Sequence, residues 1–295
     1  MKNYSRDFIQ YSDKKAKEES KNIALYLTIH ITLYIILLFF FIFFTWYTVF
    51  VSTHKFYAVY GISMKGTLNQ EISDTELHPE KLAYDGVYID KLGKIKTGEI
   101  IVLDLTEEKS VIKRLMAQEG DYISIAVTKN DLGQDCFKFY RIENGTDLTD
   151  FDDSSAIVDE TSGALGYTIY SESSWYSIHN TSVGANTKIE VDGKTVEYED
   201  RFYYTFLKNE YGTSDSKYEY FVSNAGQIYV KVPQGKVFYM GDNRARSTDG
   251  RERGFADRKN VVGRCEFIVK DFSFWSRIGE VIKYYFAEVQ DFFAR

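Results

Sequence analysis

Proline, cysteine and histidine are scarce in this sequence, and each shortage excludes a class of fold or site. The only two cysteines, Cys136 and Cys265, cannot form a disulfide framework or a zinc site of three or four sulfurs. One bridge between them stays open for a domain outside the cell. The four histidines form no HExxH or HxH pair, so we expect no metal ion and no other cofactor. The net charge of −7 argues against a nucleic-acid partner.

Charged side chains are absent between Asn22 and His54, and the apolar part of this stretch, residues 23–51, predicts a transmembrane helix. The run is too long for the apolar part of a cleaved signal peptide, and it lacks the polar stripe of a helix buried in a soluble core. Six bases and four acids precede it within the first 21 residues, whereas only Lys55 follows closely. We therefore expect a single-pass protein of the cell membrane, with residues 1–22 in the cytoplasm and the residues after about 52 outside.

Beyond the span, short segments rich in β-branched and aromatic residues alternate with turn signals, as at 84–90, 98–105 and 110–117. Residues 130–230 are more polar but still contain β-type runs, including a hairpin pattern around Asp192-Gly193. The sequence therefore predicts an all-β ectodomain with an inserted β-subdomain at 130–230.

The last segment, residues 275–295, has a different period. Apolar side chains recur there at helical spacing and charged ones lie on the opposite face, which predicts an amphipathic helix. It is too charged to span a membrane. Two placements stay equally open: docking on the ectodomain, or lying in the membrane interface.

Three segments combine into a candidate catalytic site: the stretch around Ser63, the strand-like stretch around Lys113, and Gly241-Asp-Asn-Arg-Ala-Arg-Ser-Thr-Asp-Gly-Arg251. A serine needs a base to become a nucleophile. No histidine lies in a suggestive context, and GISMKG differs from the G-x-S-x-G elbow, but a lysine can serve once apolar packing lowers its pKa from about 10.4 to about 7–8. Strand alternation predicts Lys113 inward and Arg114 outward.

In this order, the segments resemble the conserved boxes of bacterial type I signal peptidases: a membrane span, then S-M-x-P-T-L, K-R-x-x-x-x-x-G-D and G-D-N-R-x-x-S-x-D-S-R. The resemblance implies a catalytic β-domain formed by residues 52–129 and 231–274. It implies that Ser247 orients the lysine and that Asp249 forms an ion pair with Arg251. Arg114 is a further candidate partner of Asp249. The residues it assigns are Ser63 as nucleophile, Lys113 as general base, Ser247, Asp249, Arg251 and Arg114 as supporting groups, and Met64 and Gly61 on the substrate side.

The function that this resemblance implies is a membrane-anchored serine endopeptidase. Such an enzyme removes signal peptides from exported preproteins through a Ser/Lys dyad and an acyl-enzyme, with the preprotein and the lipid bilayer as its partners. The alternatives are a catalytically impaired relative acting as an assembly or binding factor, a soluble self-cleaving repressor, and the Ser-His branch of signal peptidases. The intact Ser63 and Lys113, together with the span, favour the protease.

Four positions depart from the family pattern. Gly66 and Glu119 replace prolines, Gly250 replaces the serine of D-S-R, and Gly61 replaces a serine that some members use as a second oxyanion donor. The missing prolines fit a shortage across the whole chain, which has only two. We expect Gly66 to loosen the turn after Ser63, because glycine does not preset φ as proline does.

Overall fold

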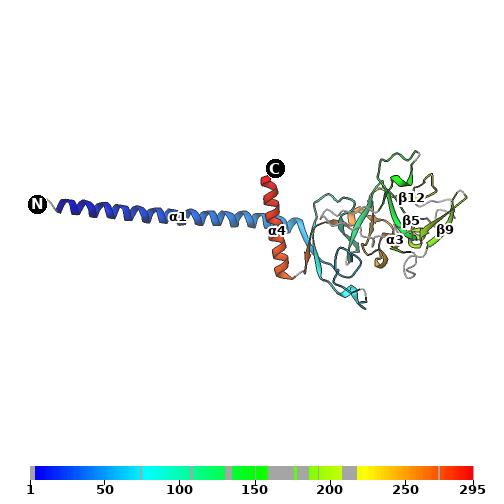
Figure 1. Ribbon diagram of the computed structural model, residues 1–295, viewed down its shortest axis with the longest axis horizontal. Coiled ribbons are helices and arrows are strands. Elements are labelled where there is room, and N and C mark those ends of the chain that lie inside the picture. Colours follow the sequence, from blue (N-terminus) through cyan, green and yellow to red (C-terminus); the bar gives the residue numbers. More distant parts are fainter. Residues whose placement is uncertain are drawn as a thin grey trace. The chain divides into compact units, whose positions relative to one another are not determined.

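The computed structural model describes residues 4–73, 75–106, 109–129, 135–149, 151–158, 176–177, 186–191, 193–207, 218–271 and 273–294. The chain divides into two units, residues 1–53 and 54–295. Figure 1 follows the chain by colour from the N-terminus to the C-terminus.

The first unit is a single helix, α1 (Tyr4–Thr53), which contains the whole predicted span. It is long and apolar enough to cross a membrane. Several of its hydroxyl groups are satisfied within the helix, because they donate to the carbonyl oxygen four residues earlier, as Thr28, Thr32 and Thr45 do at 2.8–2.9 Å. A helix that bonds its own polar groups in this way suits a hydrocarbon environment.

The second unit begins with a seven-stranded antiparallel sheet in the order β1-β2-β15-β3-β4-β13-β14. Its strands are β1 (His54–Ala58), β2 (Asp85–Asp90), β3 (Ile100–Thr106), β4 (Lys109–Gln118), β13 (Lys236–Met240), β14 (Ala256–Asp257) and β15 (Val261–Lys270). Both faces are apolar. In β3, Ile100 and Val102 join one hydrophobic cluster, and Ile101 and Leu103 join another on the opposite face.

A second sheet follows the order β11-β12-β5-β10-β9, with β6 on β5 and with β7 and β8 on β6; β5 and β12, neighbours in it, are labelled in Figure 1. Its strands are β5 (Tyr122–Lys129), β6 (Asp135–Ile142), β7 (Ile157–Val158), β8 (Tyr176–Ser177), β9 (Asn186–Val191), β10 (Lys194–Glu199), β11 (Tyr220–Val222) and β12 (Ile228–Lys231). β9 and β10 pair across the predicted hairpin, although Asp192 itself lies outside the described residues.

The two sheets share one hydrophobic core. Met116, Phe238 and Met240 from the first sheet pack in the same cluster as Ile123 and Phe139 from the second. The rings of Phe139 and Phe238 stack with centroids 5.8 Å apart and planes 6° apart. β5 pairs with β6 and β12 and therefore belongs to the second sheet. The change from the first sheet to the second thus comes before β5, earlier in the chain than the expected domain boundary after residue 129. The domain boundaries themselves stay a prediction.

Asp121 forms the crossing between the sheets, directly after Gly120, whose φ is +86°. Its carboxylate accepts hydrogen bonds from the backbone N–H groups of Gln118 at 2.9 Å and Asn144 at 3.0 Å. Gly120 and Asp121, the Gly-Asp pair of the K-R-x-x-x-x-x-G-D pattern, therefore shape a turn between the sheets and lie outside the site around Ser63. The two cysteines are both buried and free, so the bridge left open above is not formed.

Among the described residues, the helices other than α1 are short except for the last. They are η1 (Pro79–Lys81), η2 (Asp153–Ser155), α2 (Asp200–Phe202), η4 (Tyr203–Leu207), η5 (Arg244–Arg246), α3 (Gly250–Arg253), η6 (Arg258–Asn260) and α4 (Phe274–Ala294). α4 packs on the first sheet, where Val281 and Tyr285 are buried and the ring of Tyr284 stacks on Phe267 with centroids 5.0 Å apart.

Candidate active site

Ser63 lies in a tight loop that leaves the end of β1, and its side chain is half-buried. Gly61, two residues earlier, has φ +79°, a value that favours glycine. Among the described residues, the backbone N–H of Ser63 donates to no acceptor. Ser63 thus offers a hydroxyl and, beside it, a free amide donor.

Lys113 reaches Ser63 from the middle of β4. Its Nζ lies 2.7 Å from Ser63 Oγ and 3.1 Å from the carbonyl oxygen of Ile112, and the residue is only 4% exposed. Burial lowers the pKa of the Lys113 ammonium to about 8, although the carboxylates of Asp249 and Asp242 pull it upward. About a tenth of the lysine is therefore a neutral amine at pH 7. Such an amine can take the serine proton across the 2.7 Å contact.

Two cavities meet at the Ser63–Lys113 pair. One, of about 440 Å³, is lined by Gly61, apolar side chains such as Val111, and a charged rim that includes Arg246. The other, of about 230 Å³, lies along β1 and β4 and has Met64 in its wall. Gly61 and Met64, predicted on the substrate side, thus each line one of the two cavities, and a reacting group can approach the serine from both.

Asn243 fixes the serine loop from the facing segment. Its backbone N–H donates to Ser63 O at 3.1 Å, and its Nδ2 donates to Ile62 O at 3.0 Å. Gly241, two residues before it, fits closely: a Cβ there would collide with Ser63 O and with Ser247 Oγ. Both residues belong to the third motif, but sequence reasoning gave neither a role.

Asn69 holds the other end of the serine loop, and it too was missed. It is fully buried with φ +55°, a conformation that asparagine tolerates better than most residues. Its Nδ2 donates to the carbonyl oxygens of Val59 and Gly61 at 2.7 and 2.9 Å, and its Oδ1 accepts from the N–H groups of Tyr84 and Asp85 at 3.1 and 2.9 Å. One side chain therefore ties the loop to β2. The sequence offered no signal beyond its place after the first motif.

The partner of Arg114 differs from the expected one. Arg114 lies on the face of β4 opposite Lys113, as alternation predicts, but that face is buried too, so the outward orientation was wrong. Its Nε and Nη2 donate to the two oxygens of Asp242 at 2.9 and 2.8 Å, and Nη1 donates to Gly98 O. Thr67 Oγ1 donates to the same carboxylate at 2.7 Å. This bidentate pair, rather than a contact to Asp249, joins β4 to the third motif.

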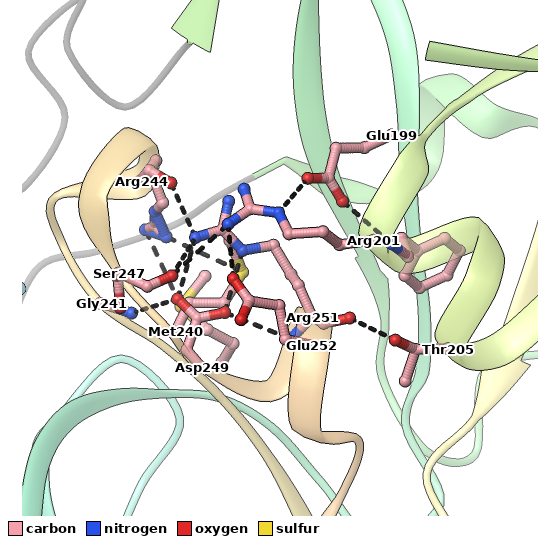
Figure 2. A network of polar contacts seen from close by, with 12 residues as sticks. Glu199, Arg201, Thr205, Met240, Gly241, Arg244, Ser247, Asp249, Arg251 and Glu252 are labelled. Atoms are coloured by element: carbon pink, nitrogen blue, oxygen red, sulfur yellow. Dashed lines mark hydrogen bonds and ion pairs between the residues drawn. The ribbon is translucent and has the colours of Figure 1, made fainter. Parts of the chain in front are cut away.

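Asp249 and Arg251 form a second buried pair. Arg251 Nε and Nη2 donate to the two oxygens of Asp249, each at 2.9 Å, and the N–H of Gly241 donates to Asp249 Oδ2 at 2.9 Å (Figure 2). Burial alone raises the pKa of a carboxyl, but the Arg251 charge and these hydrogen bonds hold the pKa of Asp249 at about 2. Asp249 therefore stays charged and fixes the Gly241 backbone beside the serine.

Ser247 is buried next to this pair, but the expected hydrogen bond to Lys113 is not formed. Its Oγ has no hydrogen-bond partner among the described residues, and it lies against the Cα of Gly241. A rotation about its χ1 torsion re-aims such a hydroxyl without any change in the backbone. The role of Ser247 in orienting the lysine stays a prediction.

Residues from the inserted region brace the segment that carries Ser247, Asp249 and Arg251. Figure 2 shows Arg201 and Thr205 reaching toward it. Arg201 Nη1 donates to Glu252 Oε1 at 3.1 Å, and its Nε donates at 2.5 Å to Glu199, a carboxylate that is fully buried. Thr205 Oγ1 donates to Arg251 O at 2.6 Å.

The departures from the family pattern fit their surroundings. Gly66 has φ +111°, which proline, with φ near −65°, cannot adopt; this turn is built for glycine and is not a loosened proline turn. A Cβ on Gly250 would lie 2.8 Å from both the Phe238 ring and Tyr239 O, so Phe238 occupies the room that a serine would need. Glu119 Oε2 accepts from Gly235 N at 2.8 Å, a contact proline cannot make.

Comparison with known proteins places these residues in a family. Residues 28–135 and 182–270, more than half of the chain, match the family described as "Signal peptidase, peptidase S26". Signal peptidase I of Bacillus licheniformis is 51% identical over 45 residues, which are 15% of this chain and 24% of that protein. Signal peptidase I of Rickettsia typhi is 47% identical over 47 residues, or 16% and 17%. The chain thus aligns with a quarter or less of each of these relatives.

A solved structure, signal peptidase I from Enterococcus faecalis, is 17% identical and covers 58% of this chain and 97% of its own, with a TM-score of 0.25. The family match includes Ser63, Lys113 and the whole third motif, and it leaves out residues 136–181 and everything after 270. With more than half of its residues matched, the chain belongs to the signal peptidase family, peptidase S26.

Proposed function

We propose that this protein is a membrane-anchored serine endopeptidase that removes signal peptides from exported preproteins. The observation that carries the proposal is the 2.7 Å contact between Lys113 Nζ and Ser63 Oγ, made by a lysine that is 4% exposed. A lysine without a catalytic role is usually charged and exposed to solvent, whereas a general base must lie within hydrogen-bond distance of the hydroxyl that it deprotonates. The same intact pair argues against the catalytically impaired alternative.

In the proposed reaction, neutral Lys113 accepts the proton of Ser63 as Oγ attacks the carbonyl carbon of the scissile peptide bond. The Ser63 N–H donates to the developing oxyanion, a kind of contact worth about 3–4 kcal/mol in the transition state. Protonated Lys113 then gives its proton to the leaving amine as the C–N bond breaks. Water, deprotonated by Lys113, hydrolyses the acyl-enzyme and restores the serine.

The supporting groups act on position rather than on bonds. Asp249 and Arg251 hold the Gly241 backbone against the serine loop, and Arg114 with Asp242 fixes the back of the strand that carries Lys113. Ser247, once rotated, orients the amine. Gly61 and Met64 border the two cavities that receive the substrate on either side of Ser63.

The location assigned to this reaction is the outer surface of the cell membrane. The family is membrane-associated, and α1 contains a segment that suits a span. With residues 1–22 in the cytoplasm, the second unit is extracytoplasmic, where the ends of signal peptides emerge.

Cleavage of a defined preprotein tests this proposal. Detergent-solubilised full-length protein is incubated with an exported preprotein that carries an Ala-x-Ala site, and the product is located by mass spectrometry. A single cut after the second alanine is expected, with no cut in a matched preprotein that has phenylalanine there. Absence of cleavage, under conditions in which a type I signal peptidase cuts the same substrate, would contradict the proposal.

The pH dependence of cleavage should report the Lys113 base. Because only the neutral amine accepts the serine proton and the pKa of Lys113 is about 8, kcat/KM should rise with pH to half its maximum near pH 8. Two pH units below that midpoint the rate should be about 100-fold lower than on the plateau. The measurement is kcat/KM from pH 5.5 to 10, with thermal unfolding followed over the same range as a control. A midpoint near 6.5 would indicate a histidine base instead.

A further inference from the structure

Helix α4 has two apolar faces, and the sheet covers only one of them. Val281 and Tyr285 point into the sheet and are buried. A second row, Trp275, Ile278, Ile282 and Phe286, follows at spacings of three, four and four residues, so its members share one side of the helix. These four side chains are exposed, Trp275 to 78%. The remaining, more polar side carries Lys283, Ala287 and Asp291, which follow at spacings of four residues and are all exposed.

The contacts of α4 place it close to the start of β1. The guanidinium of Arg277 lies over the Phe56 ring at 4.2 Å, and the ring of Tyr284 meets that of His54 with centroids 6.2 Å apart. His54 is the first residue of β1 and follows directly on Thr53, the last residue of α1. No linker separates them. Whatever angle the two units adopt, α4 therefore contacts residues only three and five positions beyond residue 51, the end of the predicted span, which is at most about 18 Å along an extended chain.

From these contacts, we propose that the exposed Trp275–Phe286 face of α4 lies in the outer interface of the lipid bilayer, as a second membrane contact of this chain. The proposal rests on the membrane anchoring proposed above. The row carries a tryptophan, a residue enriched at membrane–water interfaces, and the helix lies outside the residues matched by the family, 28–135 and 182–270.

The charges of α4 identify the force involved. Its bases, Arg277 and Lys283, are outnumbered by Glu280, Glu288 and Asp291. Attraction to anionic lipids therefore does not bind α4 to the membrane. Burial of its apolar side chains provides the binding free energy instead. Zwitterionic lipid should suffice, and the row should sit about 5–10 Å into the headgroup and acyl boundary.

Tryptophan fluorescence tests the placement in the full-length protein. The chain has three tryptophans, Trp46, Trp175 and Trp275. A Trp46→Phe/Trp175→Phe variant leaves Trp275 as the sole reporter, and a Trp175→Phe/Trp275→Phe variant leaves Trp46 in the predicted span. Both are reconstituted into phosphatidylcholine vesicles with bromine at a shallow acyl position. We expect both reporters to lose most of their fluorescence, and Trp275 to be poorly quenched by iodide in the buffer.

Two outcomes are distinguishable. Quenching of Trp46 by brominated lipid, with Trp275 open to iodide and unaffected by the lipid, would overturn the α4 proposal and leave the anchor intact. If neither is quenched, the anchor has failed and the α4 contact with it. Phe286→Asp should shift the Trp275 emission to longer wavelength and weaken its lipid quenching. Ala287→Asp, which also introduces a carboxylate but on the polar side, should do neither; equal effects would also overturn the proposal.

Discussion

Replacing Lys113 by methionine should lower kcat/KM for preprotein cleavage by at least about 1,000-fold while leaving the fold intact. Methionine fills a similar volume in the 4%-exposed site but has no lone pair for the serine proton. Ser63→Ala removes the nucleophile and should cost at least as much. Because the two groups act as one unit, the double variant should be hardly slower than either single one.

Two controls separate loss of the base from loss of structure. Lys188→Met makes the same substitution at an exposed lysine of β9 and should change neither rate nor thermal midpoint. The Lys113→Met protein should unfold at the wild-type temperature or above it, since it no longer buries an ionisable amine. If it retains a tenth of the wild-type rate, another group deprotonates Ser63.

Replacing Arg114 by methionine should destabilise the protein by about 3–5 kcal/mol. The pair with Asp242 is almost fully buried, with side-chain exposures of 0% and 1%. Removing the guanidinium leaves a buried carboxylate with Thr67 as its remaining donor and costs its desolvation energy. For a unit of this size the thermal midpoint should fall by roughly 6–20 °C, measured by circular dichroism in detergent.

A double variant distinguishes loss of the pair from loss of packing. Arg114→Met combined with Asp242→Asn removes the stranded charge and should recover a large part of the stability that the single change costs. Breaking the exposed Lys188–Glu197 pair by Lys188→Met is the matched control and should leave the midpoint where it is. If the double variant is no more stable than Arg114→Met, the arginine stabilises through packing instead.

Much of the chemistry was readable from the sequence, because motif order and strand period both bear on it. The family match confirms the resemblance. The distance between Lys113 and Ser63, 50 residues apart in sequence, was implied only by that resemblance and could not follow from local pattern. Alternation correctly put Lys113 and Arg114 on opposite faces of β4. It could not tell that both faces are buried, because burial depends on the second sheet packing against the first.

What the sequence did not reveal depends on long-range hydrogen bonds. Asn69 reads as one more polar loop residue, yet it makes four side-chain hydrogen bonds to Val59, Gly61, Tyr84 and Asp85. Gly66 read as a loosened proline turn, but the sign of its φ is fixed by the path of the backbone, which composition does not encode.

The core shared by the two sheets limits how this protein could be shortened or recombined with its relatives. Deleting the region between β5 and β13 would leave Met116, Phe238 and Met240 facing water, and it would also remove Arg201 and Thr205 from the Asp249–Arg251 segment. Phe238 additionally fills the space beside Gly250. A chimera that carries the insertion of a relative therefore needs a matching side chain at 238 and a matching residue at 250, so these positions should be exchanged together with the insertion.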